Sequence, residues 1–253
     1  MRKHAIIAAL SGALAISALA VPAAQASPTS PTVITKVVVN GGKPIVVGTT
    51  GKTVTATVTG TNDTGIGDGY VMLWHGTSDF DHRDATLSDP GTPVCASPSA
   101  TGTCTVKISV TPALNTNSLA GTWHVFAALY GTNHMSAFAF DYSKINVLRQ
   151  SKLTANATPE PVKKGKTITV SGRLSRADWA TATYGGYGSQ SVKLQFKKKG
   201  SSSFTTVKTV ASSTGGAVKT TVKASVDGSY RFVFAGNAST AGVASTADFV
   251  DVK

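Results

Sequence analysis

Two stretches of the chain show the same alternation of apolar and polar positions after a turn glycine. In residues 165–174, Ile168, Val170 and Leu174 fall on one face, whereas hydroxyl side chains and an arginine fall on the other. Residues 51–60 repeat this pattern. A period of two residues is typical of a half-buried β-strand. Its recurrence predicts a tandem of two similar β-domains, with equivalent strands at these positions.

The rest of the chain predicts further short strands between turn residues. Few stretches have helical periodicity, and glutamate occurs only once, at Glu160, so the expected fold class is all-β. Turns at regular spacing predict two tandem immunoglobulin-like Greek-key β-sandwiches, residues 32–148 and 152–253, which the short linker 149–151 brings into contact. The expected strands are residues 32–40, 44–47, 52–60, 70–75 (with Trp74 in the core), 94–95, 104–110, 121–130, 137–147, 152–157, 166–174, 190–198, 203–210, 217–223, 229–235 and 247–252.

The first 26 residues have the three parts of a secretory signal peptide. A basic start at residues 1–4 precedes an apolar run from Ala5 to Val21, and Ala24-Gln25-Ala26 matches a small-x-small cleavage site. The alternative is an uncleaved transmembrane anchor, which the short run and the cleavage site disfavour. We therefore expect a secreted, extracellular protein without a transmembrane anchor.

Charge is distributed unevenly along the chain, which has a formal net charge of +12. Residues 27–150 hold seven basic and seven acidic side chains, whereas residues 151–253 hold fifteen basic and five acidic ones. On an exported protein a basic surface favours anionic wall polymer, acidic polysaccharide, lipid headgroups or free nucleic acid. The alternative is that the charge serves solubility alone.

The two cysteines, Cys95 and Cys104, are separated by eight residues. In an exported chain they are expected to form one disulfide. Closing this short loop stabilises the fold by about 2.5–3 kcal/mol in the chain-entropy model. The spacing does not fit a zinc site, and an oxidised pair offers no catalytic thiolate.

Two local patterns resemble immunoglobulin-like domains. Tyr230 follows Gly228-Ser229, which resembles the tyrosine corner of that fold, and Trp123 takes the equivalent place in the first domain. Neither domain has the inter-sheet cysteine pair, so packing is expected to replace that bridge.

Four segments resemble small exported proteins of actinobacteria, particularly streptomycetes, and the resemblance covers nearly all of the mature chain. They are Ser151–Thr154, Pro159–Lys166, Gln190–Phe196 and Asp248–Lys253. These secreted proteins with tandem immunoglobulin-like domains are largely uncharacterised, and some carry a calcium-binding label. The resemblance therefore implies the same architecture and raises calcium as a ligand.

A cluster of carboxylates in the first domain is the candidate calcium site. It consists of Asp79, Asp81 and Asp84, with Asp63 or Asp68 from a neighbouring loop. Calcium takes several oxygen ligands from flexible loops, although the ligand order of an EF-hand is missing. The alternative is a solvated acidic loop. No other cofactor is expected.

A long connection at residues 175–189 carries Trp179, Tyr184 and Tyr187 among glycines. Aromatic side chains on a long loop can stack on sugar rings, which makes them candidate ligands for carbohydrate. The alternative is that they cap the open end of the second core, with one helical turn at residues 176–180.

Basic residues of the second domain are the candidate polyanion-binding surface. Lys193, Lys197 and Arg231 are expected on the outer face of one sheet, and Lys219 and Lys223 on the outer face of the other. Such a spread predicts weak, salt-sensitive attraction. Specific nucleic-acid recognition is not expected, because no recognition motif is present.

No catalytic constellation emerges from the sequence. The Gly-Lys-Thr at residues 51–53 and 165–167 is interpreted as a β-turn, because a phosphate-binding loop needs a glycine five residues earlier, where Val46 and Glu160 stand. The histidines of the first domain show neither helical metal-binding spacing nor a nucleophile motif.

The leading hypothesis is an exported, non-enzymatic binding or structural protein of the cell surface or wall, held on anionic polymer by its basic domain. The alternatives are a calcium-binding protein that uses the acidic loop, and a carbohydrate-binding module or accessory protein. The sequence leaves the oligomeric state open.

Overall fold

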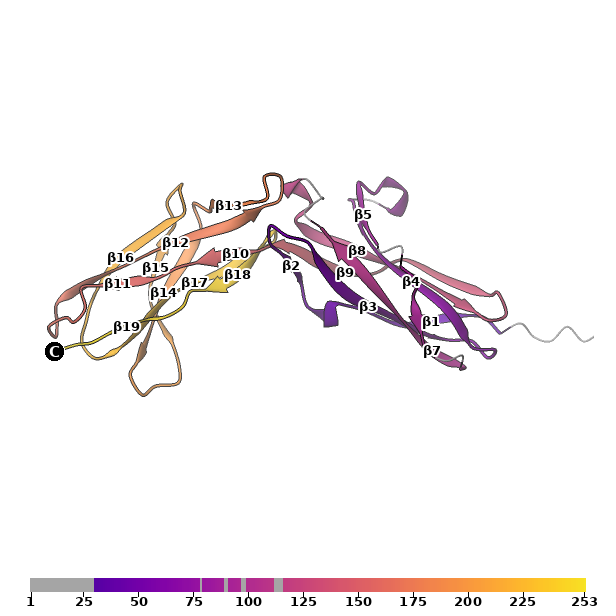
Figure 1. Cartoon of the computed structure of the whole chain (residues 1–253), viewed down its shortest axis with the longest axis horizontal. Coiled ribbons are helices and arrows are strands. Elements are labelled where there is room, and N and C mark those ends of the chain that lie inside the picture. The colour runs from indigo at the N-terminus through magenta and orange to yellow at the C-terminus, as the bar shows by residue number, and fades with distance from the viewer. Residues whose placement is uncertain (1–29, 78, 89–90, 97–98, 112–115) are drawn as a thin grey trace, which may run out of the picture.

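The computed structural model describes residues 30–77, 79–88, 91–96, 99–111 and 116–253; the expected signal peptide, residues 1–26, lies outside them. The secondary structure in these ranges consists of strands and short 3₁₀ helices. Nowhere in them is there a helix long and apolar enough to span a membrane. The fold is all-β and immunoglobulin-like, and it forms two sandwiches placed end to end (Figure 1).

The first sandwich is built from the strands up to residue 149. They are β1 (Val33–Val39), β2 (Ile45–Val47), β3 (Lys52–Thr61), β4 (Ile66–His75), β5 (Ala85–Leu87), β6 (Val94–Cys95), β7 (Thr101–Val110), β8 (Gly121–Gly131) and β9 (Ser136–Arg149), with the 3₁₀ helices η1 (Asn40–Gly42), η2 (Phe80–His82) and η4 (Asn117–Leu119). One sheet has the order β1-β3-β7-β6, and the other has the order β5-β4-β8-β9 with β2 parallel to β9.

The second sandwich is built around one long strand, β12, with which four others pair. Its strands are β10 (Ser151–Leu153), β11 (Asn156–Thr158), β12 (Thr167–Asp178), β13 (Thr183–Gly186), β14 (Ser191–Lys198), β15 (Thr205–Ala211), β16 (Ala217–Lys223), β17 (Gly228–Asn237), β18 (Thr240–Ala244) and β19 (Asp248–Val250). Strands β10, β11, β13 and β16 all pair with β12, whereas β15, β14, β17, β18 and β19 form the opposite sheet.

Alternation along the strands decides which side chains fill the two cores. Ile168, Val170 and Leu174 of β12 are fully buried, which confirms their predicted face. Val54, Ala56 and Val58 of β3 line the corresponding face in the first core. Each core thus forms where the apolar face of one sheet meets that of the other.

The glycine that opens the second repeat is a turn residue. Gly165 has a φ of +80°, and the turn is closed by the Lys166 N–H, which donates to the carbonyl of Lys163 at 3.0 Å. An extended strand follows instead of a helix. The predicted β-turn is therefore correct, and Gly-Lys-Thr is part of the scaffold.

The corner expected at Trp123 is present in the first sandwich. The Trp123 Nε1–H donates to the carbonyl of Leu119, four residues upstream, at 2.8 Å. This bond takes the place of the tyrosine hydroxyl bond of immunoglobulin-like domains. In the second sandwich, the Tyr230 ring is buried against Phe196, with their centroids 4.7 Å apart.

The two sandwiches are in contact, as the short linker predicts. Strand β9 ends at Arg149, which pairs in parallel with Thr240 of β18 and so joins a sheet of one sandwich to a sheet of the other. The buried Arg149 side chain donates from Nε to the carbonyl of Ala177 at 2.6 Å. The β12–β13 hairpin reaches across the junction to the first sandwich (Figure 1).

Gly172 is a position where the sheet tolerates no side chain. A Cβ there would lie 2.0 Å from the carbonyl oxygen of Thr154, in the backbone between β10 and β11. We expect Gly172→Ala to lower the free energy of unfolding by about 1–3 kcal/mol, the usual cost of overpacking. Gly185→Ala, which adds a Cβ in open space, is the matched control. Equal denaturant midpoints for the two variants would contradict this account.

Candidate functional site

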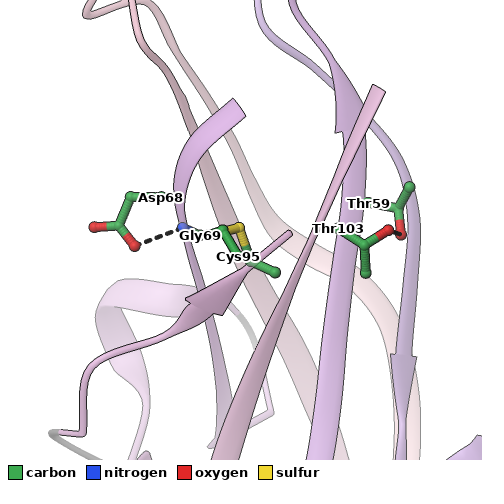
Figure 2. The surroundings of a disulfide bond; sticks show 6 residues. Thr59, Asp68, Gly69, Cys95 and Thr103 are labelled. Atoms are coloured by element: carbon green, nitrogen blue, oxygen red, sulfur yellow. Dashed lines mark hydrogen bonds between the residues drawn. A yellow bond between two sulfur atoms is a disulfide. The ribbon is translucent and has the colours of Figure 1, made fainter. Parts of the chain in front are cut away.

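The predicted disulfide is confirmed, and it links neighbouring strands of one sheet. Cys95 of β6 and Cys104 of β7 are directly opposite each other. Figure 2 shows the bridge beside Gly69 of the opposite sheet, whose N–H donates to the Asp68 carboxylate. A Cβ at Gly69 would come within 2.8 Å of the Cys104 Cβ, so the glycine makes room for the bridge. Such a bridge is typical of proteins in oxidising compartments.

Histidines organise the segment from Asp79 to Asp84, which we call the acidic loop. The Asp79 carboxylate accepts hydrogen bonds from the backbone N–H groups of Asp81 and His82 and lies 2.7 Å from His82 Nδ1. Asp84 lies 2.7 Å from His75 Nδ1. The hydrogen bond between Asp79 and His82 lowers the pKa of Asp79 and raises that of His82. These carboxylates therefore hold their own loop in place.

The expected grouping of Asp79, Asp81 and Asp84 with Asp63 or Asp68 around one cation needs correction. Asp63 and Asp68 lie at the start of β4, whereas Asp79, Asp81 and Asp84 follow its end. From Asp68 to the end of β4 there are seven residue steps at about 3.3 Å each, so the strand separates the two groups by roughly 23 Å or more. In the described part of the chain, no three His, Cys, Asp or Glu side chains come together as a metal site. Asp89, the next aspartate after this cluster in the sequence, lies outside the described residues.

The expected aromatic loop is a β-hairpin, and Trp179 at its tip is buried. Strand β12 continues to Asp178, and β13 returns along it. The Trp179 side chain is only 2% exposed, packs into the first core, and donates from Nε1 to the carbonyl of Val47 at 3.3 Å. The expectation that Trp179 stacks on a sugar ring is therefore wrong, because the other sandwich covers it.

A hydrogen-bonded clamp fixes this insertion. Asn117 of η4 donates from Nδ2 to the Asp178 carboxylate at 3.0 Å and accepts from the Trp179 backbone N–H at 2.9 Å. The Asp178 carboxylate also accepts from the backbone N–H groups of Ala180 and Thr181. The hydrogen bond from Asn117 is the main cause that lowers the pKa of Asp178. One residue of the first sandwich thus orders the hairpin tip of the second.

The two tyrosines of this segment also have structural partners. Tyr187 is 9% exposed, packs edge-on against Phe234, and accepts a hydrogen bond from Asn237 at 2.6 Å. Tyr184 packs against the first core, and its hydroxyl donates to the Gln150 side chain. The three aromatics therefore do not form a common platform, which corrects the expected carbohydrate site. The alternative role as core caps fits Tyr187.

The basic residues lie on the predicted faces of the second sandwich. Lys193 and Lys197 of β14 lie on the outer face of one sheet. Arg231 of β17 shares this face, since it stands opposite Gln195 of β14. Lys219 and Lys223 point outward from β16 in the other sheet. Within the described ranges, none of these five cations forms an ion pair with a carboxylate: the two lysine–aspartate pairs are Lys199–Asp227 and Lys253–Asp251.

A continuous group of aromatic side chains covers the outer side of the first sandwich, which the sequence analysis did not predict. We call it the aromatic face. Its rings are those of Tyr70 and Trp74 of β4, Phe80 of η2, His124, Phe126 and Tyr130 of β8, and Phe138 and Phe140 of β9, and Met72 of β4 packs among them. Trp74 is buried as expected, but in this outer cluster and not in the core between the sheets.

Trp74 is the buried residue on which the other rings of the aromatic face pack. Its ring stacks on His124 at 4.0 Å, and its Nε1–H donates to the Phe140 carbonyl at 2.7 Å, beside the bulge in β9. Phe80 packs edge-on against the same indole, with ring centroids 5.9 Å apart. The acidic loop therefore serves as one wall of this face.

The sequence contains a signal that could have revealed the aromatic face. Residues 70–74 are Tyr-Val-Met-Leu-Trp, an apolar run without alternation. In an antiparallel sandwich, one side of a strand normally faces water and is polar. An unbroken apolar run therefore indicates that the outward side also has something to cover.

One family model matches part of the chain, and the matched part lies within the first sandwich. Residues 46–129 match the model of a family described as "Family of unknown function (DUF5707)". The matched region contains the disulfide and strands β4 and β7, and it ends within β8. The sequence matches none of the curated proteins with which it was compared.

Several solved structures are similar at low identity. The dimeric latent PorU of Porphyromonas gingivalis is 13% identical, with a TM-score of 0.29 over 92% of this chain and 21% of PorU, so this chain spans about a fifth of PorU. The D0-D1 domain of intimin is 14% identical, with a TM-score of 0.28 over 86% of this chain and 98% of its own. The titin domains z1z2, solved in complex with telethonin, are 13% identical, with a TM-score of 0.29 over 90% and 98% of the two chains.

Replacing Trp179 tests the insertion of the hairpin. We expect Trp179→Ala to reduce the free energy of unfolding by about 3–5 kcal/mol, because it empties an indole site in the first core. Trp179→Phe keeps most of the apolar contact, so its loss should be clearly smaller. Denaturant titration followed by circular dichroism measures both. A change below about 1 kcal/mol in the alanine variant would contradict the insertion.

The pair of His82 and Asp79 gives a pH-dependent signal. Because the hydrogen bond that the His82 ring donates to the Asp79 carboxylate raises the pKa of His82 above 6.5, the contribution of the pair to stability is complete below about pH 6.5 and is lost as pH rises through the raised value. NMR titration of the His82 ring should show this elevation, and Asp79→Asn should remove it. Asp81→Asn, which removes a weaker interaction, is the control; an equal effect of both variants would exclude the proposed cause.

Proposed function

We propose that this is an exported, non-enzymatic binding protein of the cell surface, held on anionic polymer by its basic second sandwich. One observation carries this proposal: the cations Lys193, Lys197, Lys219, Lys223 and Arg231 are presented on the outer faces of this sandwich without carboxylate partners in the described part of the chain. Their charge is therefore free to attract a polyanion.

The carboxylates of the second sandwich are occupied elsewhere, which supports the proposal. Asp227 pairs with Lys199 at 3.2 Å and accepts the Val252 N–H. Asp248 accepts the Ala157 N–H, and Asp178 belongs to the clamp. With five acidic side chains against fifteen basic ones, most of the positive charge is left without a neutralising partner.

The distribution of the cations favours diffuse attraction over a shaped binding pocket. The outer face of β14 and β17 and that of β16 belong to opposite sheets, so no single groove collects the five side chains. Two of them are held against an aromatic ring, since Arg231 lies 3.8 Å and Lys197 lies 5.1 Å from the centroid of Phe204. Such an arrangement suits a flexible polymer with repeating negative charge.

Salt-dependent retention of the full chain tests this proposal. Retention on purified Gram-positive cell wall and on polyphosphate beads should fall steeply between about 0.05 and 0.5 M salt, as the Debye length shortens below about 10 Å. A variant with Lys→Gln at positions 193, 197, 219 and 223 should elute at clearly lower salt. Deleting the second sandwich is unsuitable, because Trp179 would leave the first core.

The matched control carries the same change of net charge in the first sandwich. It has Lys→Gln at Lys36, Lys43, Lys52 and Lys107, all of them exposed. Equal effects of the two quadruple variants would show that net charge alone acts. Retention that ignores salt, or no retention at all, would refute the proposal.

A further inference from the structure

We propose that the aromatic face of the first sandwich binds a neutral polysaccharide, whose sugar rings stack along the exposed rings of β8 and β9. This site is separate from the cationic faces of the second sandwich. It also differs from the hairpin residues Trp179, Tyr184 and Tyr187, which the structure assigns to packing.

Three rings of the aromatic face are unusually exposed to solvent. Phe138 is 52% exposed and Phe140 is 54% exposed, and Tyr130 beside them is 37% exposed. Phenylalanine is among the residues most often buried, and a contiguous exposed patch of such side chains marks an interaction site. Phe138 and Phe140 stand on β9, which at these residues pairs with β8 on one side and forms the edge of the sheet on the other.

The exposed rings are also continuous. Ring centroids follow one another at 6.0 Å from Tyr130 to Phe138 and at 6.5 Å from Phe138 to Phe140. At Phe140 this row of three rings joins a compact cluster, in which Phe80, Phe126 and Phe140 lie 5.3–5.5 Å from one another and Phe126 is buried. An extended polymer fits such a row better than a single small molecule.

The two most exposed rings share an orientation. The planes of Phe138 and Phe140 differ by 28°, whereas Tyr130 stands edge-on to Phe138 at 86°. The near-parallel rings of Phe138 and Phe140 therefore present their negatively charged faces in a similar direction. The flat side of a sugar ring presents C–H bonds, which are attracted to such faces, while its hydroxyl groups point to the rim.

The aromatic face is held rigidly. The face is built on strands, and the hydrogen bond from Trp74 to the Phe140 carbonyl, with its stacking on His124, holds the two outer strands together over β8. Rings fixed in this way lose little conformational freedom when a ligand arrives, which favours binding.

The charged side chains around the aromatic face favour a neutral ligand. Asp68 stands opposite Tyr130, Asp79 precedes Phe80, and Asp141 lies beside His124. The cations nearby are Arg83, whose guanidinium lies 4.2 Å over the Phe80 ring, and Lys144, opposite His124. The rim thus has no excess of positive charge to attract an anion, and its carboxylates can accept hydrogen bonds from hydroxyl groups.

The experiment is retention of the full chain on insoluble cellulose, chitin and starch at about 1 M salt. At this ionic strength the Debye length is about 3 Å, so electrostatic retention by the second sandwich is suppressed. We expect the protein to bind at least one of these neutral glycans. Phe138→Ala/Phe140→Ala should weaken that binding by at least tenfold.

Two further variants make the result decisive. Phe249→Ala removes a phenylalanine that is 42% exposed on β19 of the second sandwich, and it should bind like the unchanged protein. Phe140→Trp keeps a broad ring beside Phe138 and should retain binding. The test therefore stands even where the double alanine variant fails to fold. Thermal unfolding of each variant reports its folding.

Three outcomes would overturn this inference. They are no binding of the unchanged protein to any of the three glycans, equal binding by the double alanine variant in its folded form, and concentration-dependent dimers in sedimentation that the same substitutions abolish. The last outcome would assign the aromatic face to a second copy of the chain. Polyanion retention at low salt is measured separately, so failure of one proposal leaves the other intact.

Discussion

Trp179 belongs to the second sandwich in sequence and to the first sandwich in packing, and the arrangement of the whole molecule depends on this ring. Its burial in the first core fixes the β12–β13 hairpin, and the hairpin in turn fixes Arg149 and the start of the second sandwich. An indole is among the largest apolar side chains that a core can accommodate, so removing it from water stabilises both the contact and the relative placement of the two sandwiches.

This coupling gives the protein two surfaces of different chemistry on one frame. The second sandwich presents lysines without carboxylate partners in the described ranges, whereas the first presents a row of aromatic rings with carboxylates at its rim. A protein with one surface for charged polymer and another for neutral polymer could hold two components of a cell surface together. Weak contacts of two kinds also reinforce each other when they share a rigid frame.

The sequence was a good guide wherever local chemistry decides the outcome. The period-two pattern predicted the buried face of β12, the spacing of Cys95 and Cys104 predicted the disulfide, and Gly165 predicted a turn. It failed where residues distant in sequence meet. The expected calcium grouping joined aspartates at the two ends of β4, because clustering in sequence does not mean clustering in space along an extended strand.

The sequence by itself determined most of the strands, the two cores, the disulfide and the concentration of positive charge in the second half, since each follows from neighbouring residues and their alternation. It missed the short strands β5, β13 and β18. Only the tertiary structure decided what the aromatic residues do. Trp179 on a glycine-rich segment and Phe138 on an alternating strand look equally available in the sequence, yet one is 2% exposed and the other 52%. The difference arises because the first sandwich covers the hairpin, whereas no described segment of the chain covers the outer side of β9.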